Sequence, residues 1–139
     1  MNFRVFVYGI PKGQPRSRAF ARNGRVRVYD PGTAENWKSQ IAQALQAHIP
    51  ETPIPVPVTL FLRFFFPRPK SHFRRNGELR PSAPVAHTAK PDLDNAAKAV
   101  MDAMTQIGIL ADDALVYRMG ISKVYADKSA GCSIELVAE

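Results

Sequence analysis

The chain has 139 residues, enough for a single domain (residues 1–139) with a hydrophobic core of its own. Its hydrophobic content of 45% excludes global disorder, and its single cysteine, Cys132, excludes internal disulfides and a cysteine-based zinc site. Nineteen Lys and Arg residues against twelve Asp and Glu give a net charge of +7. Such a charge is typical of nucleic-acid-binding proteins, but many basic proteins bind nothing acidic.

The N-terminal part predicts a strand followed by a basic hairpin. Residues 3–8 are apolar on both faces of an extended chain, which predicts a central strand, and they lack the layout of a signal peptide. No apolar run approaches the roughly 20 residues that span a bilayer, so we expect a cytoplasmic protein without membrane contact. Asn23-Gly24 favours a type I′ hairpin turn, because both central residues need positive φ. Such a hairpin places Arg25 and Arg27 on one face.

The middle of the chain predicts a helix and a core strand. Residues 33–47 have helical spacing and residues 58–66 alternate as a strand, with a proline-rich connector between them. The residues expected in the core are Trp37, Ile41 and Leu45 of the helix and Val58, Leu60, Leu62, Phe64 and Phe66 of the strand. Residues 67–91 form a long loop rich in proline, lysine and arginine, and loops of such length are usually functional or disordered.

The C-terminal part predicts a second helix and two strands. Residues 92–108 form the helix, with Gly108 as its stop, residues 115–125 form a strand, and residues 131–137 form its antiparallel partner. The faces expected toward the core carry Leu93, Ala97, Val100, Met104 and Ile107 in the helix, and Leu115, Tyr117, Met119 and Ile121 in the strand. The prediction is a small α/β domain: a mixed four-stranded sheet with two helices, a basic hairpin and a basic loop.

Carboxylates are concentrated in one short window of this basic chain. Five of its twelve acidic residues lie there: Asp92, Asp94, Asp102, Asp112 and Asp113. Asp92 suits a helix N-cap and Asp94 suits an exposed pair with Lys98, and each role would contribute only about 0.3–1 kcal/mol. Helix rules do not account for Asp112 and Asp113, and a helix usually packs beside the strand that it leads into. Converging carboxylates repel unless a divalent cation neutralises them, and such hard oxygen ligands suit Mg²⁺ or Mn²⁺.

The spacing of these residues resembles a known family. Asp-Leu-Asp-Asn at 92–95, Lys98, Asp-Asp-Ala at 112–114 and Gly-x-Pro-Lys-Gly-x-Pro-Arg at 9–16 are similar to the motifs of the RusA-like Holliday junction resolvases. These are small endodeoxyribonucleases of phage and prophage type, and the resemblance covers essentially the whole chain. It implies a homodimer that cuts four-way junctions and other branched DNA by Mg²⁺-dependent phosphodiester hydrolysis, with Mn²⁺ as a substitute.

The resemblance also implies roles for individual residues. Those that match its catalytic and metal-binding positions are Asp92, Asp94, Lys98, Asp113 and, in a supporting role, Asp112. Asn95 matches the motif asparagine, which we expect to orient the metal ligands. The chain departs from the pattern at Pro91, where some members have a basic residue, and here Lys90 comes one place earlier. Asp102 lies outside the motif and is expected at the surface or in an ion pair with Lys98.

Basic residues on both sides of the acidic window are expected to hold DNA phosphates. They are Lys12, Arg16, Arg18, Arg22, Arg25, Arg27, Arg68, Lys70, Arg74 and Arg75. For any single one of them a solvated surface position is the alternative, and only the clustering argues for DNA. Two other functions stay open: a non-catalytic DNA-binding protein with a vestigial acidic cluster, and a small metal-dependent phosphatase for soluble substrates.

Overall fold

The computed structural model describes residues 1–15, 18–22, 25–29 and 34–139, the two short ranges by their backbone alone. The strands in these ranges are β1 (Asn2–Tyr8), β2 (Arg18–Arg22), β3 (Arg25–Tyr29), β4 (Val58–Phe66), β5 (Val116–Tyr125) and β6 (Gly131–Ala138). The helices are α1 (Glu35–Leu45) and α2 (Leu93–Gln106), with short 3₁₀ turns η1 (Gln46–His48), η2 (Lys70–His72) and η3 (Asp113–Leu115). The expected small α/β domain is confirmed.

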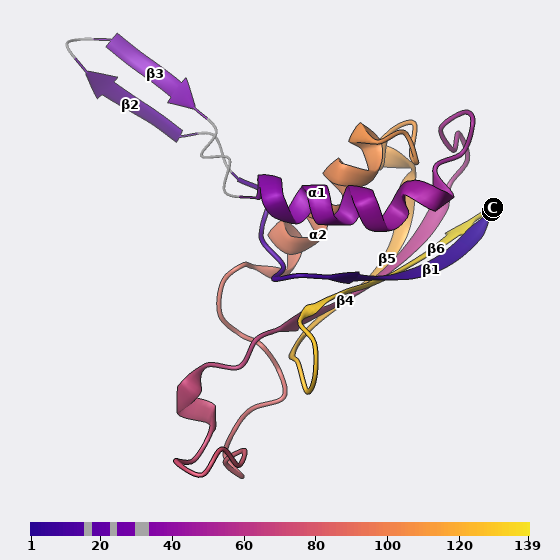
Figure 1. Ribbon diagram of the computed structural model, residues 1–139. Coiled ribbons are helices and arrows are strands. Elements are labelled where there is room, and N and C mark those ends of the chain that lie inside the picture. Colours follow the sequence, from indigo (N-terminus) through magenta and orange to yellow (C-terminus); the bar gives the residue numbers. More distant parts are fainter. Residues whose placement is uncertain (16–17, 23–24, 30–33) are drawn as a thin grey trace.

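The main sheet has the strand order β1-β6-β4-β5, and both α-helices cover the same face of it (Figure 1). β4 and β5 are parallel, as expected for two strands joined by a helical crossover, whereas β6 is antiparallel to both β1 and β4. The expected pairing of residues 131–137 with residues 115–125 is therefore wrong. The crossover through α2 puts β5 at the edge, and β6 occupies the position between β1 and β4.

β1 is an edge strand although both of its faces are apolar, so its expected central position is also wrong. One face packs into the core through Phe3 and Val7. On the other face the ring of Phe6 lies 4.8 Å from Tyr8 and 5.8 Å from Phe65, measured between centroids. This aromatic cluster lies on the sheet face away from α1 and α2. The second apolar face of β1 therefore reflects a local cluster and not burial under a second layer.

The core between the helices and the sheet consists largely of the residues that the sequence predicted. The alternate residues of β4 from Val58 to Phe66 are at most 4% exposed. α1 contributes Trp37, Ile41 and Leu45, each at most 1% exposed. Cys132 of β6 is fully buried, and burial raises the pKa of its thiol to about 12, so it serves as a small apolar core residue.

Two predicted core residues are exposed instead. Tyr117 is 59% exposed, because a β-bulge at Val58 and Thr59 shifts the pairing of β4 with β5 by one residue. An extra residue reverses the alternation of side chains along the strand, so Tyr117 turns outward. Leu93 is 43% exposed, because it is the first residue of α2 and precedes the turns that pack on the sheet.

β2 and β3 form a two-stranded sheet of their own, which confirms the predicted hairpin. Arg22 pairs with Arg25, a register that leaves two residues for the turn. Those two residues, Asn23 and Gly24, lie outside the described part of the chain, as do the side chains of both strands. Among the described helices, none is long and apolar enough to cross a membrane.

The long loop between β4 and α2 returns to the sheet before the helix begins. His87 N donates to Lys123 O at 3.1 Å, and Tyr125 N donates to Val85 O at 2.9 Å, so the return limb of the loop lies along the end of β5. These backbone bonds bring the chain to the start of α2 in a defined position. The loop thus places the acidic motif at one end of the sheet.

Candidate active site

Asp92 and Asp94 lie together at the start of α2. Asp92 is the N-cap residue and Asp94 lies in the first turn, and both residues are exposed. The carboxylate of Asp92 makes no capping hydrogen bond to the helix, but its Oδ1 accepts from Lys90 Nζ at 2.7 Å. The helix N-terminus itself favours anions, and Lys90 offsets the charge of Asp92 there.

Lys98 lies one turn farther along α2 and is exposed. Within the described part of the chain its ammonium group makes no hydrogen bond or ion pair, so the spacing-based pair with Asp94 does not form. The ammonium is therefore available to a phosphate at the start of the helix.

The start of α2 is fixed to the far end of β5. Lys123 Nζ donates to the carbonyl oxygens of Ala89 and Pro91, at 2.8 and 2.6 Å. The acceptors lie three residues and one residue before Asp92, so Lys123 holds the segment that leads into the acidic motif. Lys123 lies near the C-terminal end of the ten-residue β5, and Asp92 therefore lies at that end of the strand.

Asp112 and Asp113 lie at the opposite end of β5. Asp112 Oδ1 accepts a backbone N–H two residues on, at 2.8 Å, and so caps η3, a local role that the sequence analysis did not foresee. Asp113 is exposed in η3, directly before Val116, the first residue of β5. At roughly 3.3 Å per residue, the strand from Val116 to Lys123 is about 23 Å long. One chain therefore does not bring Asp113 to Asp92.

The convergence of both acidic pairs is thus not found within one chain. Among the residues that the structure describes, no group of three or more His, Cys, Asp or Glu side chains is arranged to hold a metal ion. Asp92 and Asp94 still offer two exposed carboxylates at one end of α2. Mg²⁺ is commonly held by one or two carboxylates and completes its shell with waters and substrate phosphates. The donor set at this end of the helix therefore fits Mg²⁺ bound together with a phosphate.

The N-terminal segment, residues 9–15, lies against the start of α2. Gln14 N donates to Asn95 O at 3.0 Å. Gly13 leaves no space for a side chain, because a Cβ there would lie 2.6 Å from Asn95 Nδ2 and 3.0 Å from Pro91 Cβ. The glycine- and proline-rich motif and the acidic motif, which are far apart in sequence, thus form one unit. Asn95 contacts the segment with its side chain, and its role toward metal ligands stays a prediction.

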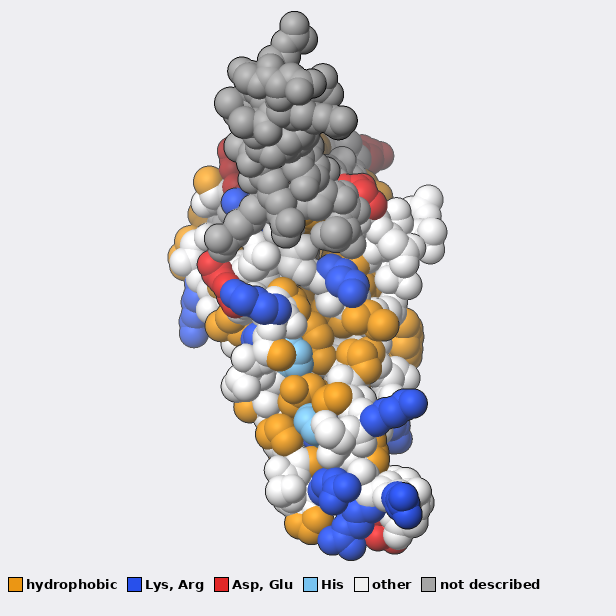
Figure 2. Space-filling model, turned by 90° about the vertical axis from the view of Figure 1, so that its left-hand side faces the viewer, with side chains coloured by type: hydrophobic (Ala, Val, Ile, Leu, Met, Phe, Trp, Pro, Cys, Tyr) orange, Lys and Arg blue, Asp and Glu red, His pale blue; other side chains and the backbone are white. Residues whose placement is uncertain are grey.

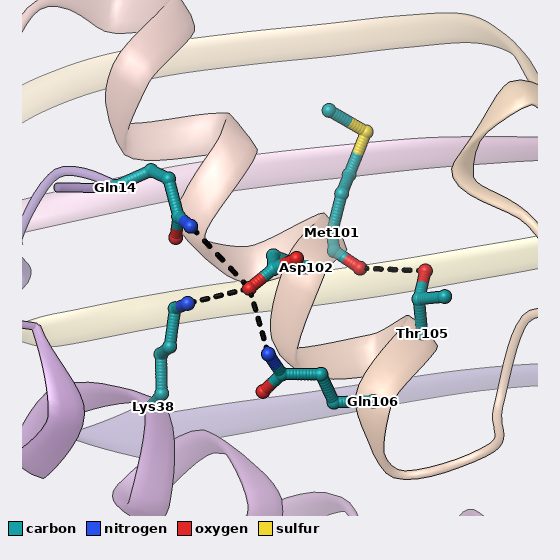
Figure 3. A network of polar contacts seen from close by, with 6 residues as sticks. All are labelled: Gln14, Lys38, Met101, Asp102, Thr105 and Gln106. Atoms are coloured by element: carbon teal, nitrogen blue, oxygen red, sulfur yellow. Dashed lines mark hydrogen bonds and ion pairs between the residues drawn. The ribbon is translucent and has the colours of Figure 1, made fainter. Parts of the chain in front are cut away.

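Asp102 connects α2 to α1 and to this N-terminal segment (Figure 3). Its Oδ2 accepts from Lys38 Nζ at 2.5 Å, from Gln106 Nε2 at 3.1 Å and from Gln14 Nε2 at 3.4 Å. The side chain of Lys38 is only 8% exposed, so Asp102 neutralises a buried charge. The predicted ion pair between Asp102 and Lys98 is therefore wrong. An exposed lysine remains solvated by water, whereas the buried ammonium of Lys38 depends on a carboxylate.

We expect Asp102→Ala to lower the free energy of unfolding by about 3 kcal/mol, because it leaves the buried ammonium of Lys38 without its partner. Adding Lys38→Met should restore part of this loss, since it removes the uncompensated charge. Urea unfolding of the two single variants and the double variant measures both effects. A loss below about 0.5 kcal/mol, the range of ordinary surface substitutions, would contradict the assigned role of Asp102.

A cavity of about 720 Å³ lies between the N-terminal segment and the start of α2. Its lining includes Gln14 from the segment, Phe66 from the end of β4, His87 from the loop, and Lys90 and Asp92 next to α2. Its volume is in the range of sites that hold small molecules or parts of larger ligands. The exposed carboxylate of Asp92 thus stands at the edge of a concave space.

Lysine and arginine side chains gather at the lower end of the face in Figure 2, where Figure 1 places the loop between β4 and α2. The exposed loop residues among the predicted DNA contacts are Lys70, Arg74 and Arg75. Arg68 is engaged within the protein: it donates to Pro84 O at 2.7 Å and lies over the ring of Tyr125 at 5.3 Å. Arg68 therefore braces the two limbs of the loop.

The other predicted DNA contacts belong to the N-terminal part. Lys12 is exposed in the segment beside α2. Arg16 lies outside the described residues, and so do the side chains of Arg18, Arg22, Arg25 and Arg27 on β2 and β3. Contacts of these residues with DNA stay predictions.

Three residues that the sequence analysis did not single out hold this region together: Gln14, Lys38 and Lys123. Lys38 had a weak signal, because it directly follows Trp37 in the core-facing part of α1. Gln14 and Lys123 reach their partners only through the tertiary fold, and their sequence neighbourhoods carry no sign of it.

Comparison with known proteins agrees with these motifs. The family model for Endodeoxyribonuclease RusA matches residues 9–137, nearly the whole chain. Uncharacterized protein YqaN of Bacillus subtilis (strain 168) is 36% identical over 124 residues, which cover 88% of this chain and 87% of that protein. The family match includes the N-terminal segment, the acidic motif at the start of α2 and the aspartate pair before β5.

Proposed function

Because the chain belongs to the RusA endodeoxyribonuclease family, we propose that it is a Mg²⁺-dependent crossover junction endonuclease. It would resolve Holliday junctions and other branched DNA in recombination and repair, in the cytoplasm. The observation that carries the proposal is made at the start of α2. Asp92 and Asp94 are exposed there, and Lys98, one turn farther along, forms no ion pair with any described residue. Cleavage of a synthetic four-way junction with Mg²⁺ and with EDTA is the direct test.

The chemistry follows from the residues at this end of the helix. Asp92 and Asp94 would hold Mg²⁺, with Mn²⁺ as a substitute, and the bound ion would lower the pKa of a water molecule and stabilise charge on the scissile phosphate. Lys98 donates to a phosphate oxygen and offsets the negative charge that develops during attack. Asn95 keeps its proposed role in orienting the carboxylates.

The position of Asp113 supports a homodimer. A site with three carboxylates needs Asp113 beside Asp92 and Asp94, and the length of β5 keeps them apart within one chain. In a dimer with a two-fold axis, Asp112 and Asp113 of one protomer can lie beside the start of α2 of the other protomer. The same two-fold axis gives two sites, which is the number needed to cut opposed strands of a four-way junction. Each site would then contain residues of both protomers.

The basic hairpin would hold DNA phosphates beside these sites. We expect Arg25→Ala combined with Arg27→Ala to weaken junction binding uniformly and to reduce the slope of log affinity against log salt by about 2. Fluorescence anisotropy of a labelled junction at several salt concentrations measures the slope in EDTA, without cleavage.

A matched control removes the same charge elsewhere. Arg4 and Arg63 lie on the sheet face away from the helices and line a second cavity there with Glu135. The Arg4→Ala, Arg63→Ala double variant should leave the salt slope nearly unchanged. Equal slopes for the two double variants would show that binding responds only to net charge, and the hairpin would lose its proposed role.

A further inference from the structure

The cavity beside Asp92 has polar atoms that the protein itself does not satisfy. His87 Nδ1 and Gln14 Oε1 are both buried and have no hydrogen-bond partner among the described residues. His87 is only 7% exposed, so water reaches its ring poorly. A buried polar group without a partner costs about 1–3 kcal/mol, which a fold tolerates where a ligand later supplies the bond. Both residues line the same cavity.

These two atoms define what a ligand must offer. The pKa of His87 lies below its ordinary value, because burial disfavours the imidazolium ion and the charge of Lys123 adds to the effect. A neutral imidazole has one donor and one acceptor nitrogen, and the amide oxygen of Gln14 only accepts. A ligand with at least one N–H and further polar atoms on one edge would satisfy both residues.

The wall beside these atoms is flat and aromatic. The rings of His87 and Phe66 are stacked, with centroids 3.8 Å apart and planes inclined by 13°. Tyr125 packs edge-on against His87 at 5.0 Å. Both residues line the cavity, so a planar ligand in it meets aromatic side chains.

The opposite wall is held in place before any ligand arrives. The side chain of Gln14 donates to Asp102 on α2 (Figure 3). Its backbone N–H also donates to α2, at Asn95 O, and Gly13 packs against Asn95 without space for a Cβ. The ion pair between Lys38 and Asp102 fixes this arrangement from α1. A cavity with fixed walls costs a ligand little reorganisation on binding.

We propose that this cavity receives an unstacked nucleobase of the DNA strand that is cut, next to the scissile phosphate at the start of α2. The inference rests on the proposed endonuclease function and adds a base-binding subsite to it. A base has a flat face for the aromatic wall and an N–H-bearing edge for Gln14 and His87. Exposed Lys12, in the lining, lies where a backbone phosphate can reach it.

The subsite also gives a physical reason for selecting branched DNA. Extracting a base from an intact duplex costs unstacking and unpairing energy, whereas bases at a branch point are already partly unstacked. An enzyme that must seat one base beside the reacting phosphate therefore cuts more readily where the base is loose. Selectivity for structure then arises from the cavity as well as from the symmetry of the dimer.

The test is single-turnover cleavage of four-way junctions by the full-length wild-type protein in Mg²⁺. Junctions with one abasic nucleotide, placed in turn at each position flanking the cut, are compared with the intact junction. We expect one abasic position to slow cleavage roughly ten- to hundredfold, the effect of losing one base–aromatic stack. Cleavage of every abasic junction at the intact rate would overturn the subsite while leaving the endonuclease standing. A protein that does not cut the intact junction would overturn both.

A pair of variants assigns the effect to the cavity. His87→Phe keeps a ring on Phe66 but removes Nδ1. It should therefore slow cleavage of the intact junction and reduce the further loss of rate that the abasic nucleotide causes. If His87 has only a structural role, the substitution should slow cleavage of both junctions by the same factor. That result would overturn the assignment of His87 to the base-binding subsite. His72→Phe is the matched control, because His72 packs on Tyr125 at 4.7 Å outside the cavity, and the abasic penalty should stay at the wild-type value.

Discussion

Asp94→Asn is expected to lower the rate of junction cleavage in Mg²⁺ by roughly a thousandfold or more, which corresponds to about 4 kcal/mol of transition-state stabilisation. The substitution removes a charged metal ligand from the first turn of α2, where it is exposed and carries little of the fold. Junction binding should persist or tighten, because one negative charge facing the phosphates is lost. Cleavage gels and binding measurements in EDTA, with the same protein preparation, separate the two effects.

Asp127→Asn provides the control for this result. Asp127 is also exposed, but it lies between β5 and β6, outside the acidic motif. The Asp127→Asn variant should cleave junctions at the wild-type rate. A folded Asp94→Asn protein that no longer binds junctions, or that still cleaves them, would contradict the role given to Asp94.

The second large effect is restoration of activity by mixing two inactive variants. Asp94→Asn and Asp113→Asn homodimers should both be inactive. If each site combines Asp92 and Asp94 of one protomer with Asp113 of the other, a mixed dimer has one site with both substitutions and one site with neither. On a supercoiled plasmid with an extruded cruciform, the wild type should give linear product. Co-expressed variants should give nicked circles, because only one strand is cut in each binding event.

A different pair of variants shows whether mixing itself matters. Asp92→Asn and Asp94→Asn alter the same side of the site, so each site of their mixed dimer keeps one substitution and no nicking should return. Sites built within single protomers would give no rescue with either pair. Failure of the first pair to restore nicking, with mixed dimers demonstrated by affinity tags, would therefore refute the shared site.

The local elements could be predicted well from the sequence, because the apolar spacing of a helix or strand depends only on residues close to one another in the chain. The bounds of β4 match the expected strand at residues 58–66, and the i, i+4, i+8 stripe of Trp37, Ile41 and Leu45 is the buried face of α1. Pairing between distant strands has no such local signature. The crossover through α2 places β5 on one side of β4, and β6 pairs with the other side of β4, next to β1.

The candidate site could be predicted only in part for the same reason. The acidic motif and its place at a helix start follow from Pro91, Asp92 and the apolar stripe after them. The distance between Asp92 and Asp113 depends on the direction of β5, which the sequence pattern does not reveal. The partner of Asp102 could not be predicted either, since the burial of Lys38 arises from the packing of α1 on α2.

Cleavage of a synthetic four-way junction by the wild-type chain, with Mg²⁺ and with EDTA, tests the proposed function most directly. The labelled junction should be bound under both conditions and cut at two opposed strands only in Mg²⁺, with Mn²⁺ able to replace it. Single-stranded and linear duplex DNA of the same sequence should be cut far more slowly. Tight junction binding without Mg²⁺-dependent nicking would instead identify a non-catalytic DNA-binding protein and contradict the endonuclease.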